Sequence, residues 1–429
     1  MVVGLAVSIA LHELGHFIPA KLFGVKVSQF MIGFGPTLFS RTRGETEFGV
    51  KAIPLGGYIS MAGMFPPAKE GGPARTASTG FFQTLVQDAR TASADTITVG
   101  DEHRTFYTLP IWKRIVIMLG GPFMNLVIAV VLYAVVLCGF GIPQQSTTIG
   151  SVSACALPAT SERQTCDATD PVAPGAAAGI RPGDTLVSID GTTVTGWDQA
   201  TQLIRDSPDQ AIAIVVSRDG ADVDLTATPS LTERYVTDAA GAIVNDPSGT
   251  PVTQQVGFLG IGAALETVQQ PVTAVLPAVG NNMAQVGHLI LNLPQRLLDV
   301  AKAAFGPGER DPNGPISVVG VGRVAGEIAS VDSAPVADRA SALINIVASL
   351  NVALLVFNLV PLLPLDGGHV AGALFEGVRR FFARIFKRKD PGPVDTAKLI
   401  PLTLTVVMIL GAMSALLIYA DIVKPIAFF

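Results

Sequence analysis

Two histidines and a glutamate stand within five residues near the start of the chain, as His12-Glu13-Leu14-Gly15-His16. On a helix, side chains four residues apart face the same side, with about 5–6 Å between their Cβ atoms. That spacing lets two imidazoles bind one Zn²⁺ at ~2.0–2.1 Å. Glu13 lies beside the first histidine, where its carboxylate can take a proton from a water that the metal activates. The pattern therefore predicts a zinc site with Glu13 as the general base.

A third zinc ligand is expected elsewhere, because a catalytic zinc takes three protein ligands and keeps one position open. Asp366 ends an apolar run within 358-NLVPLLPLDGGH-369. A carboxylate at such a place is costly unless it is paired or binds something. Pro361 and Pro364 interrupt the helix before it, and irregular backbone at membrane depth is tolerated where it lines a water-filled cavity. We expect Asp366 to complete the ligand set.

The composition indicates a membrane protein. Of the 429 residues, 49% are apolar and only 15% are charged, whereas soluble chains carry about 25% charged residues. A spanning helix needs about 20 mostly apolar residues. Four segments are predicted to span: 1–23 with the HExxH motif, 111–140, 341–366 with the Leu-Asp-Gly motif, and 398–423. The mild net charge of −5 gives no support for nucleic-acid binding, which needs a basic face.

Basic residues in the loops predict the orientation. Lysine and arginine number ten in residues 24–114 and seven in 366–398, but only ten in the much longer stretch 141–340. The two denser loops are expected on the cytoplasmic side of a bacterial plasma membrane, and the long middle stretch outside. The active site then lies toward the cytoplasmic side. Only eleven residues precede His12, so we expect the native first helix to begin upstream.

Residues 150–264 alternate in polarity and are predicted to form a separate extracytoplasmic domain. Pro182-Gly183-Asp184 predicts a turn, 185–189 a strand, Asp190-Gly191 a hairpin, 197–204 a helix, and 211–216 and 222–226 two more strands. This order resembles a PDZ domain of the bacterial protease type. Such a domain binds an extended peptide or a chain end, or it acts only as a steric plug. A disulfide between Cys155 and Cys166 would close a small polar loop, and such bonds persist outside the cell.

The two motifs together resemble the site-2 protease family of intramembrane zinc metalloproteases. HExxH in the first span and NxxPxxPxDGG in the third carry the resemblance, and it covers the whole chain. Further matches are GFGP at 33–36, PLGGY at 54–58 and GPFMN at 121–125. The first two resemble the family's membrane re-entrant β-hairpin, which places that hairpin within 24–66. The combination is most similar to the actinobacterial branch, whose outer domain carries a similar cysteine pair.

The resemblance implies a role for each matching residue. It implies that zinc is bound by His12, His16 and Asp366, and that Glu13 is the catalytic base. It further implies that Asn358 helps to hold the substrate or the oxyanion. Gly56 and Gly57 belong to the hairpin that presents the substrate backbone.

Three further segments connect the predicted elements. Residues 67–110 are expected to form a cytoplasmic loop, and 265–340 an extracytoplasmic amphipathic segment. Residues 367–397 should form a cytoplasmic basic helix or loop. Its mixture of basic and aromatic residues favours a helix on the anionic inner leaflet, although a topology signal alone would give the same composition.

The expected fold is thus an α-helical polytopic membrane protein with a re-entrant β-hairpin and an inserted extracytoplasmic PDZ (α+β) domain. The resemblance implies intramembrane cleavage of single-span membrane proteins, such as an anti-sigma factor that another protease has already cut. Clearance of remnant signal peptides would need the same site. A metal-binding scaffold or transporter is an alternative from another class, although it would have no need of Glu13.

Overall fold

The computed structural model describes residues 1–66, 93, 96–97, 100–161, 163, 165–237, 243–246, 250–307, 310–311, 314–332, 334–394 and 396–426. It divides into two compact units. We call Met1–Phe140 with Pro271–Phe429 the helical unit, and Gly141–Gln270 the inserted domain. The predicted domain at 150–264 lies within the second. Most of the predicted loop at 67–110 lies outside the described residues.

Four helices among the described residues are long and apolar enough to cross a membrane. They are α1 (Val2–Leu22), α3 (Ile111–Ala134) with the π-helical turn η3 (Val135–Phe140), α9 (Val336–Asn358) and α11 (Ile400–Val423). One predicted boundary is wrong: the third span does not continue to residue 366. It ends at Asn358, because the two prolines that follow cannot continue a helix, and Asp366 instead begins α10 (Asp366–Ile385).

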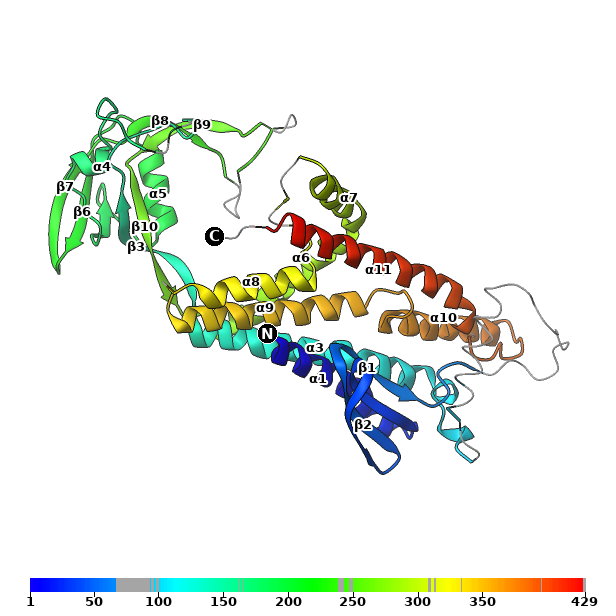
Figure 1. Cartoon of the computed structure of the whole chain (residues 1–429). Helices are drawn as coiled ribbons and strands as arrows, with labels where there is room; N and C mark the ends of the chain where they lie inside the picture. Colours follow the sequence, from blue (N-terminus) through cyan, green and yellow to red (C-terminus); the bar gives the residue numbers. More distant parts are fainter. Residues whose placement is uncertain are drawn as a thin grey trace. The chain divides into compact units, whose positions relative to one another are not determined.

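Helices α1, α3 and α9 pack together in the helical unit (Figure 1). The α1–α3 contact is tight, since a Cβ added at Gly15 would meet the backbone carbonyl of Gly120. A buried hydrogen bond of 2.9 Å from Asn351 Nδ2 to Ser8 Oγ joins α9 to α1. Small residues and interhelical hydrogen bonds hold helices together where the surroundings are as apolar as the helices.

A long antiparallel hairpin follows α1 and lies beside it (Figure 1). Its strands are β1 (Val27–Arg43) and β2 (Thr46–Met61). Residues 29–32 of β1 pair with two stretches of β2, namely 47–50 and 57–60. The predicted β region at 24–66 therefore contains a hairpin, whose bends bring residues 57–60 back toward α1.

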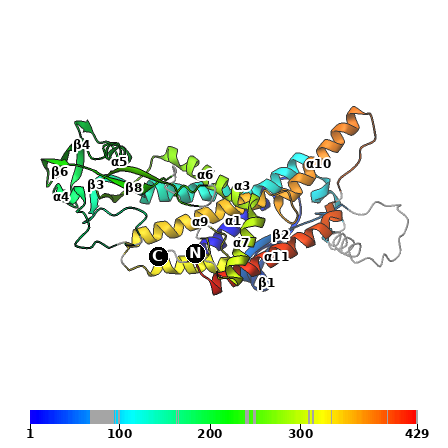
Figure 2. The same ribbon diagram turned by 90° about the horizontal axis from the view of Figure 1, so that it is seen from above.

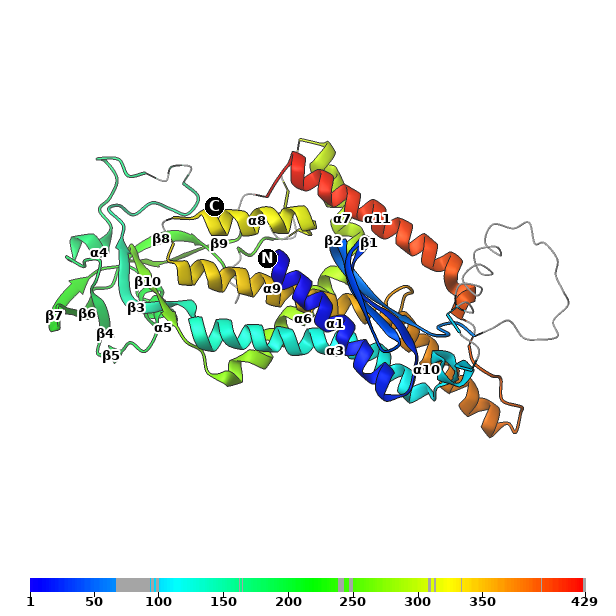
Figure 3. The same cartoon turned by 60° about the horizontal axis from the view of Figure 1, so that its bottom comes forward.

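The rest of the helical unit is formed by shorter helices. Along the sequence, the inserted domain is followed by α6 (Val275–Leu291), α7 (Leu293–Phe305) and α8 (Val318–Ser330), and then by α9. Helix α8 runs alongside α9 (Figure 3). The far end of α11 is joined to the segment before α8 by a buried ion pair between Asp421 and Arg310. Short 3₁₀ turns, η1 (Glu102–Arg104), η2 (Phe106–Thr108), η4 (Val272–Ala274) and η5 (Thr396–Leu399), complete the unit.

The inserted domain is a small α+β fold around an apolar core. Its main sheet has the order β10-β3-β4-β6-β7 with β5 beside β4, and β8 and β9 pair separately. The strands are β3 (Ile142–Val152), β4 (Thr185–Ile189), β5 (Thr192–Thr193), β6 (Ile212–Arg218), β7 (Ala221–Ala227), β8 (Ser230–Tyr235), β9 (Thr253–Phe258) and β10 (Ile261–Val268), with helices α4 (Pro174–Ala177) and α5 (Trp197–Arg205). The predicted strands and helix are confirmed to within two residues. Cys155 and Cys166 are joined in a disulfide.

Candidate metal centre

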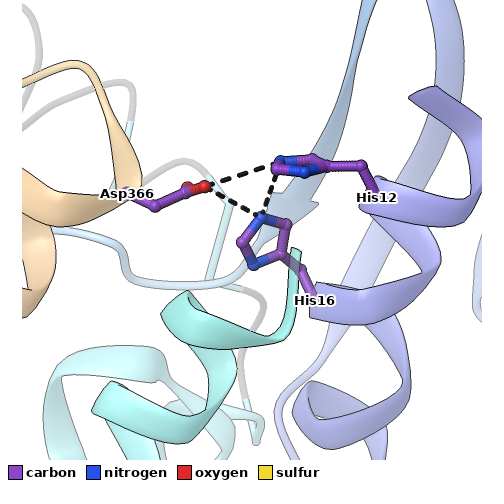
Figure 4. A group of neighbouring side chains, drawn as sticks. All are labelled: His12, His16 and Asp366. Carbon is purple, nitrogen blue, oxygen red and sulfur yellow. Dashed lines mark hydrogen bonds and ion pairs between the residues drawn. The ribbon is translucent and has the colours of Figure 1, made fainter. Parts of the chain in front are cut away.

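His12 and His16 lie one turn apart on α1 and point toward the same space (Figure 4). Their Nε2 atoms are 3.2 Å apart. Asp366, the first residue of α10, reaches them from the opposite side, with its Oδ2 3.5 Å from His12 Nε2 and 3.3 Å from His16 Nε2. The structure thus brings together three side chains that the sequence separates by 350 residues.

The three atoms fit a tetrahedral zinc ion. Ligand atoms at ~2.0–2.1 Å from such an ion lie about 3.3–3.4 Å from each other, which matches the 3.2–3.5 Å separations. Asp366 Oδ2 is also buried and accepts no hydrogen bond of normal geometry. A buried carboxylate oxygen without a donor is costly, so a cation between the three groups would satisfy it.

Helix α3 orients both imidazoles. His16 Nδ1 lies 2.7 Å from the carbonyl oxygen of Ile117, which can only accept, so Nδ1 carries the proton and Nε2 keeps its lone pair. Asn125 Nδ2 lies 3.0 Å from His12 Nδ1, while Asn125 Oδ1 is buried without a partner. A half-turn of that amide would let Oδ1 accept the Nδ1 proton of His12 and leave its Nε2 free for a metal.

Two positions on α3 lie at the site, and both belong to the GPFMN motif at 121–125, for which the sequence indicated a resemblance but no role. One is Asn125, an amide within an apolar span. The other is Gly121: a Cβ there would collide with His16 Nε2 and lie 2.7 Å from His12 Nε2. Its lack of a side chain leaves room for the two rings.

Glu13 is buried beside the histidines and close to the hairpin. A Cβ added at Gly57 would lie 2.9 Å from Glu13 Cγ, so this glycine lets β2 approach the glutamate closely. Gly56 has a φ of +114°, a conformation that side chains oppose. The hairpin therefore reaches the site through two residues at which a larger side chain would collide or strain the backbone.

A cavity of about 370 Å³ joins these groups. All seven residues that were predicted for the active site line it: His12, Glu13, His16, Gly56, Gly57, Asn358 and Asp366. Asn358 is the last residue of α9, at the point where the helix stops. His369, for which the sequence indicated no role, also lines the cavity. The cavity is thus lined by the three candidate ligands, by the Glu13 carboxylate and, on one side, by strand β2.

Comparison with known proteins gives concordant matches. The family model described as "Peptidase family M50" matches residues 1–389. The zinc metalloprotease Rip1 of Mycobacterium tuberculosis (strain H37Rv) is 34% identical over 99% of this chain and 96% of its own length. Rip1 of Mycolicibacterium smegmatis has the same identity and coverage. The metalloprotease MmpA of Caulobacter vibrioides is 30% identical over 88% of this chain and 85% of its own length.

Proposed function

This chain belongs to peptidase family M50, the site-2 proteases, and is a zinc metalloprotease; on that premise we propose that it hydrolyses a peptide bond within or near the transmembrane segment of single-span membrane proteins. The observation that carries the proposal is the position of the candidate centre. His12, Glu13 and His16 lie midway along a helix able to span a membrane. Their side chains line a cavity inside the protein.

We assign the ligand role to His12, His16 and Asp366. Zinc bound there would supply a Lewis acid for the scissile carbonyl and the attacking water. Glu13 faces the same cavity and acts as the base that takes the proton and passes it to the leaving amine. Asn358 lines the cavity, where its amide donates to the substrate backbone or to the oxyanion.

The hairpin presents the substrate to these groups. Peptide bonds inside a helix are shielded, so the substrate must unwind locally before attack. Residues 57–60 of β2 pair with β1 on one side, and several of them line the cavity. An unwound segment can therefore add to β2 as a further strand. Gly56 and Gly57 keep this part of the strand free of side chains that would hold the substrate away from Glu13.

We further propose that the substrate is an anti-sigma factor type of protein, shortened outside the membrane by a first protease, so that cleavage here completes regulated intramembrane proteolysis. The density of basic residues supports cleavage toward the cytoplasmic side of the plasma membrane. A strain that carries Glu13→Gln identifies the substrates, because their shortened, uncut forms accumulate and can be found by proteomics. Accumulation of signal-peptide remnants alone would instead indicate a housekeeping role.

We propose that the inserted domain acts as a PDZ domain and binds the new chain end of the shortened substrate. A second cavity of about 390 Å³ supports this, because it combines apolar walls with Arg205 and Arg234. The Arg234 guanidinium stacks on Phe258, and its Nε and Nη2 are buried without a hydrogen-bond partner. Burial, and then the charge of Arg205, lower the pKa of Arg234. A chain-terminal carboxylate would accept hydrogen bonds from Arg234 and offset one of the two positive charges of Arg205 and Arg234.

The decisive test replaces the proposed base. Glu13→Gln keeps the shape of the side chain but removes its basicity. We expect the purified variant to retain zinc at the wild-type stoichiometry and to lose cleavage of a single-span model substrate. Cleavage at the wild-type rate would exclude this site as the protease centre. For the inserted domain, Arg234→Gln should raise KM for a substrate that ends in a free carboxylate and leave its kcat unchanged.

A further inference from the structure

A fully buried carboxylate lies on α10, away from the cavity. The side chain of Glu376 is 0% exposed. Its Oε1 accepts from Arg114 Nη2 at 2.6 Å and lies 3.0 Å from Arg380 Nη2, while its Oε2 accepts from the backbone N–H of Val394 at 3.0 Å. Desolvating such a group costs several kcal/mol unless it is paired. Breaking the pair with Arg114 of α3 would leave this buried charge without its closest partner, so the pair restrains the position of α10 relative to α3.

The two helices joined by this pair are those that position the metal site. Arg114 lies three residues before Ile117, whose carbonyl orients His16, on the same helix that carries Asn125 beside His12. Helix α10 begins at Asp366 and contains Glu376 ten residues later, about 15 Å along the axis. Figure 2 shows α10 beside α3. One ion pair thus connects the histidine-orienting helix to the helix that starts with the third ligand.

The turns before Asp366 hold only the first turn of α10. Helix α9 ends at Asn358, and residues 359–365 form turns that pack closely on the start of α10, since a Cβ added at Gly367 would collide with the carbonyl oxygen of Val360. A ligand must be held within about 0.5 Å of its productive position. Because a helix is stiff over three turns, locking α10 at Glu376 restrains the direction of the helix and so where its first residue lies. The salt bridge supplies a second fixed point, beyond those turns.

We propose that the Arg114–Glu376 ion pair is a positioning device that holds Asp366 in register with His12 and His16. The proposal rests on the assignment of Asp366 as a metal ligand. Neither residue lines the cavity, so neither touches substrate or metal. Their effect is transmitted through α3 and α10, and it is expected in zinc affinity rather than in the chemistry of cleavage alone.

Zinc affinity of the purified full chain, measured by competition with a chromophoric chelator, tests the proposal. Glu376→Gln keeps the shape but removes the charge, and we expect zinc to bind about tenfold more weakly, the lower end of the loss when a direct hydrogen-bond partner of a ligand is removed. Arg114→Gln should lose zinc affinity too, but less, because Glu376 keeps Arg380 as a partner. The double variant should lose no more than Glu376→Gln alone, because the Arg114–Glu376 pair is already absent in that variant. Arg114→Lys keeps the charge and should lose less.

The chain offers a matched control in Asp421, which forms another buried ion pair, with Arg310, in the same unit. Asp421→Asn should lower the midpoint of thermal unfolding, as Glu376→Gln does, but leave zinc affinity at the wild-type value. Equal losses of zinc affinity in the two variants, or none in Glu376→Gln, would overturn the positioning role. Should Glu376→Gln not fold, the comparison of Arg114→Gln with Asp421→Asn decides in the same way.

Failure of the underlying assignment gives a different result. Asp366→Asn should reduce bound zinc strongly if Asp366 is a ligand. Unchanged zinc stoichiometry in Asp366→Asn would show that Asp366 is not a ligand, and it would overturn this inference as well. A loss in Asp366→Asn with wild-type affinity in Glu376→Gln would overturn only the inference.

Discussion

In the inserted domain, nearly all of the buried side chains are aliphatic and come from both the sheet and α5, for instance Leu186, Ile214 and Ala200. In the helical unit, by contrast, Asn125, Asn351 and Glu376 are fully buried, while large apolar side chains such as Met408 and Ile409 of α11 are exposed. The first pattern is that of a domain surrounded by water. The second is that of helices surrounded by lipid, in which apolar side chains face outward.

The buried groups of the two units therefore have different roles. The apolar core of the inserted domain stabilises that domain and contacts no reactive group. Most buried polar side chains among the described residues lie in the helical unit, and those on α3 and α10 either contact the candidate ligands or join the helices that carry them. Substitutions in the helical unit near the cavity should therefore change zinc binding, whereas substitutions in the core of the inserted domain should change local stability.

The largest effect is expected for Gly121→Ala. The added Cβ would collide with the His16 ring and displace both imidazoles, so zinc binding and cleavage should both be lost. Zinc stoichiometry of the purified protein measures this. Gly411→Ala on α11 is the control, because its Cβ would meet nothing within 4 Å. Normal zinc content in Gly121→Ala would show that the site tolerates displacement of its ligands.

Removal of a support for His12 should have a smaller effect. In Asn125→Leu the ring loses its hydrogen-bond partner and its preferred orientation, so zinc affinity should fall about 10–100-fold. Chelator competition measures the change. Asn125→Asp retains an acceptor for the Nδ1 proton and should retain most of the affinity. Similar losses in both variants would contradict an orienting role.

Loss of a buried ion pair in the inserted domain, away from its proposed peptide cavity, should change local stability and leave zinc affinity unchanged. Asp184 is buried and accepts from Arg218 Nε at 2.7 Å and Nη2 at 2.8 Å. Asp184→Asn should lower the local free energy of unfolding by about 1–3 kcal/mol, measured by hydrogen exchange in β4 and β6, with zinc affinity unchanged. The exposed Asp222→Asn serves as control. A change in zinc affinity in Asp184→Asn would show that the stability of the inserted domain affects the metal site.

The same carboxylate predicts a pH dependence. Its hydrogen bonds with Arg218 lower the pKa of Asp184 below the ordinary value. The stabilisation is therefore fully present above the pKa of the unfolded chain, about 3.9, and is lost as the pH falls through the lower folded pKa. Exchange in β4 should accelerate below about pH 4 in the wild type and much less so in Asp184→Asn.

The smallest effect is expected for a buried polar contact of the helical unit that does not support the ligands. Ser8→Ala removes the hydrogen bond from Asn351, and such bonds between membrane helices contribute about 0.6 kcal/mol. The thermal midpoint should fall slightly and zinc affinity should stay the same. Ser349→Ala, which removes the contact with Tyr133, should behave alike. A loss of zinc affinity here would mean that any loosening of the helices disturbs the site.

Local patterns in the sequence predicted much of this protein. The four spans follow from runs of apolar residues, and β4 was predicted with its observed bounds from alternation between two turns. The end of the third span was placed too late, since the prolines were taken to break the helix without stopping it at Asn358. Gly121 and Asn125 were noted only as the ends of a matching motif, because their roles beside the histidines depend on which helix faces them.

The sequence by itself determined that His12 and His16 share one face of a helix, because a helical turn is a local property of the chain. It also marked Asp366 as a carboxylate in a costly place. Only the tertiary structure decided that its Oδ2 lies 3.3 Å from His16 Nε2, and that Arg114 meets Glu376 across 262 residues. Those distances depend on how α1, α3 and α10 pack, and close packing is decided by long-range contacts that no local pattern contains.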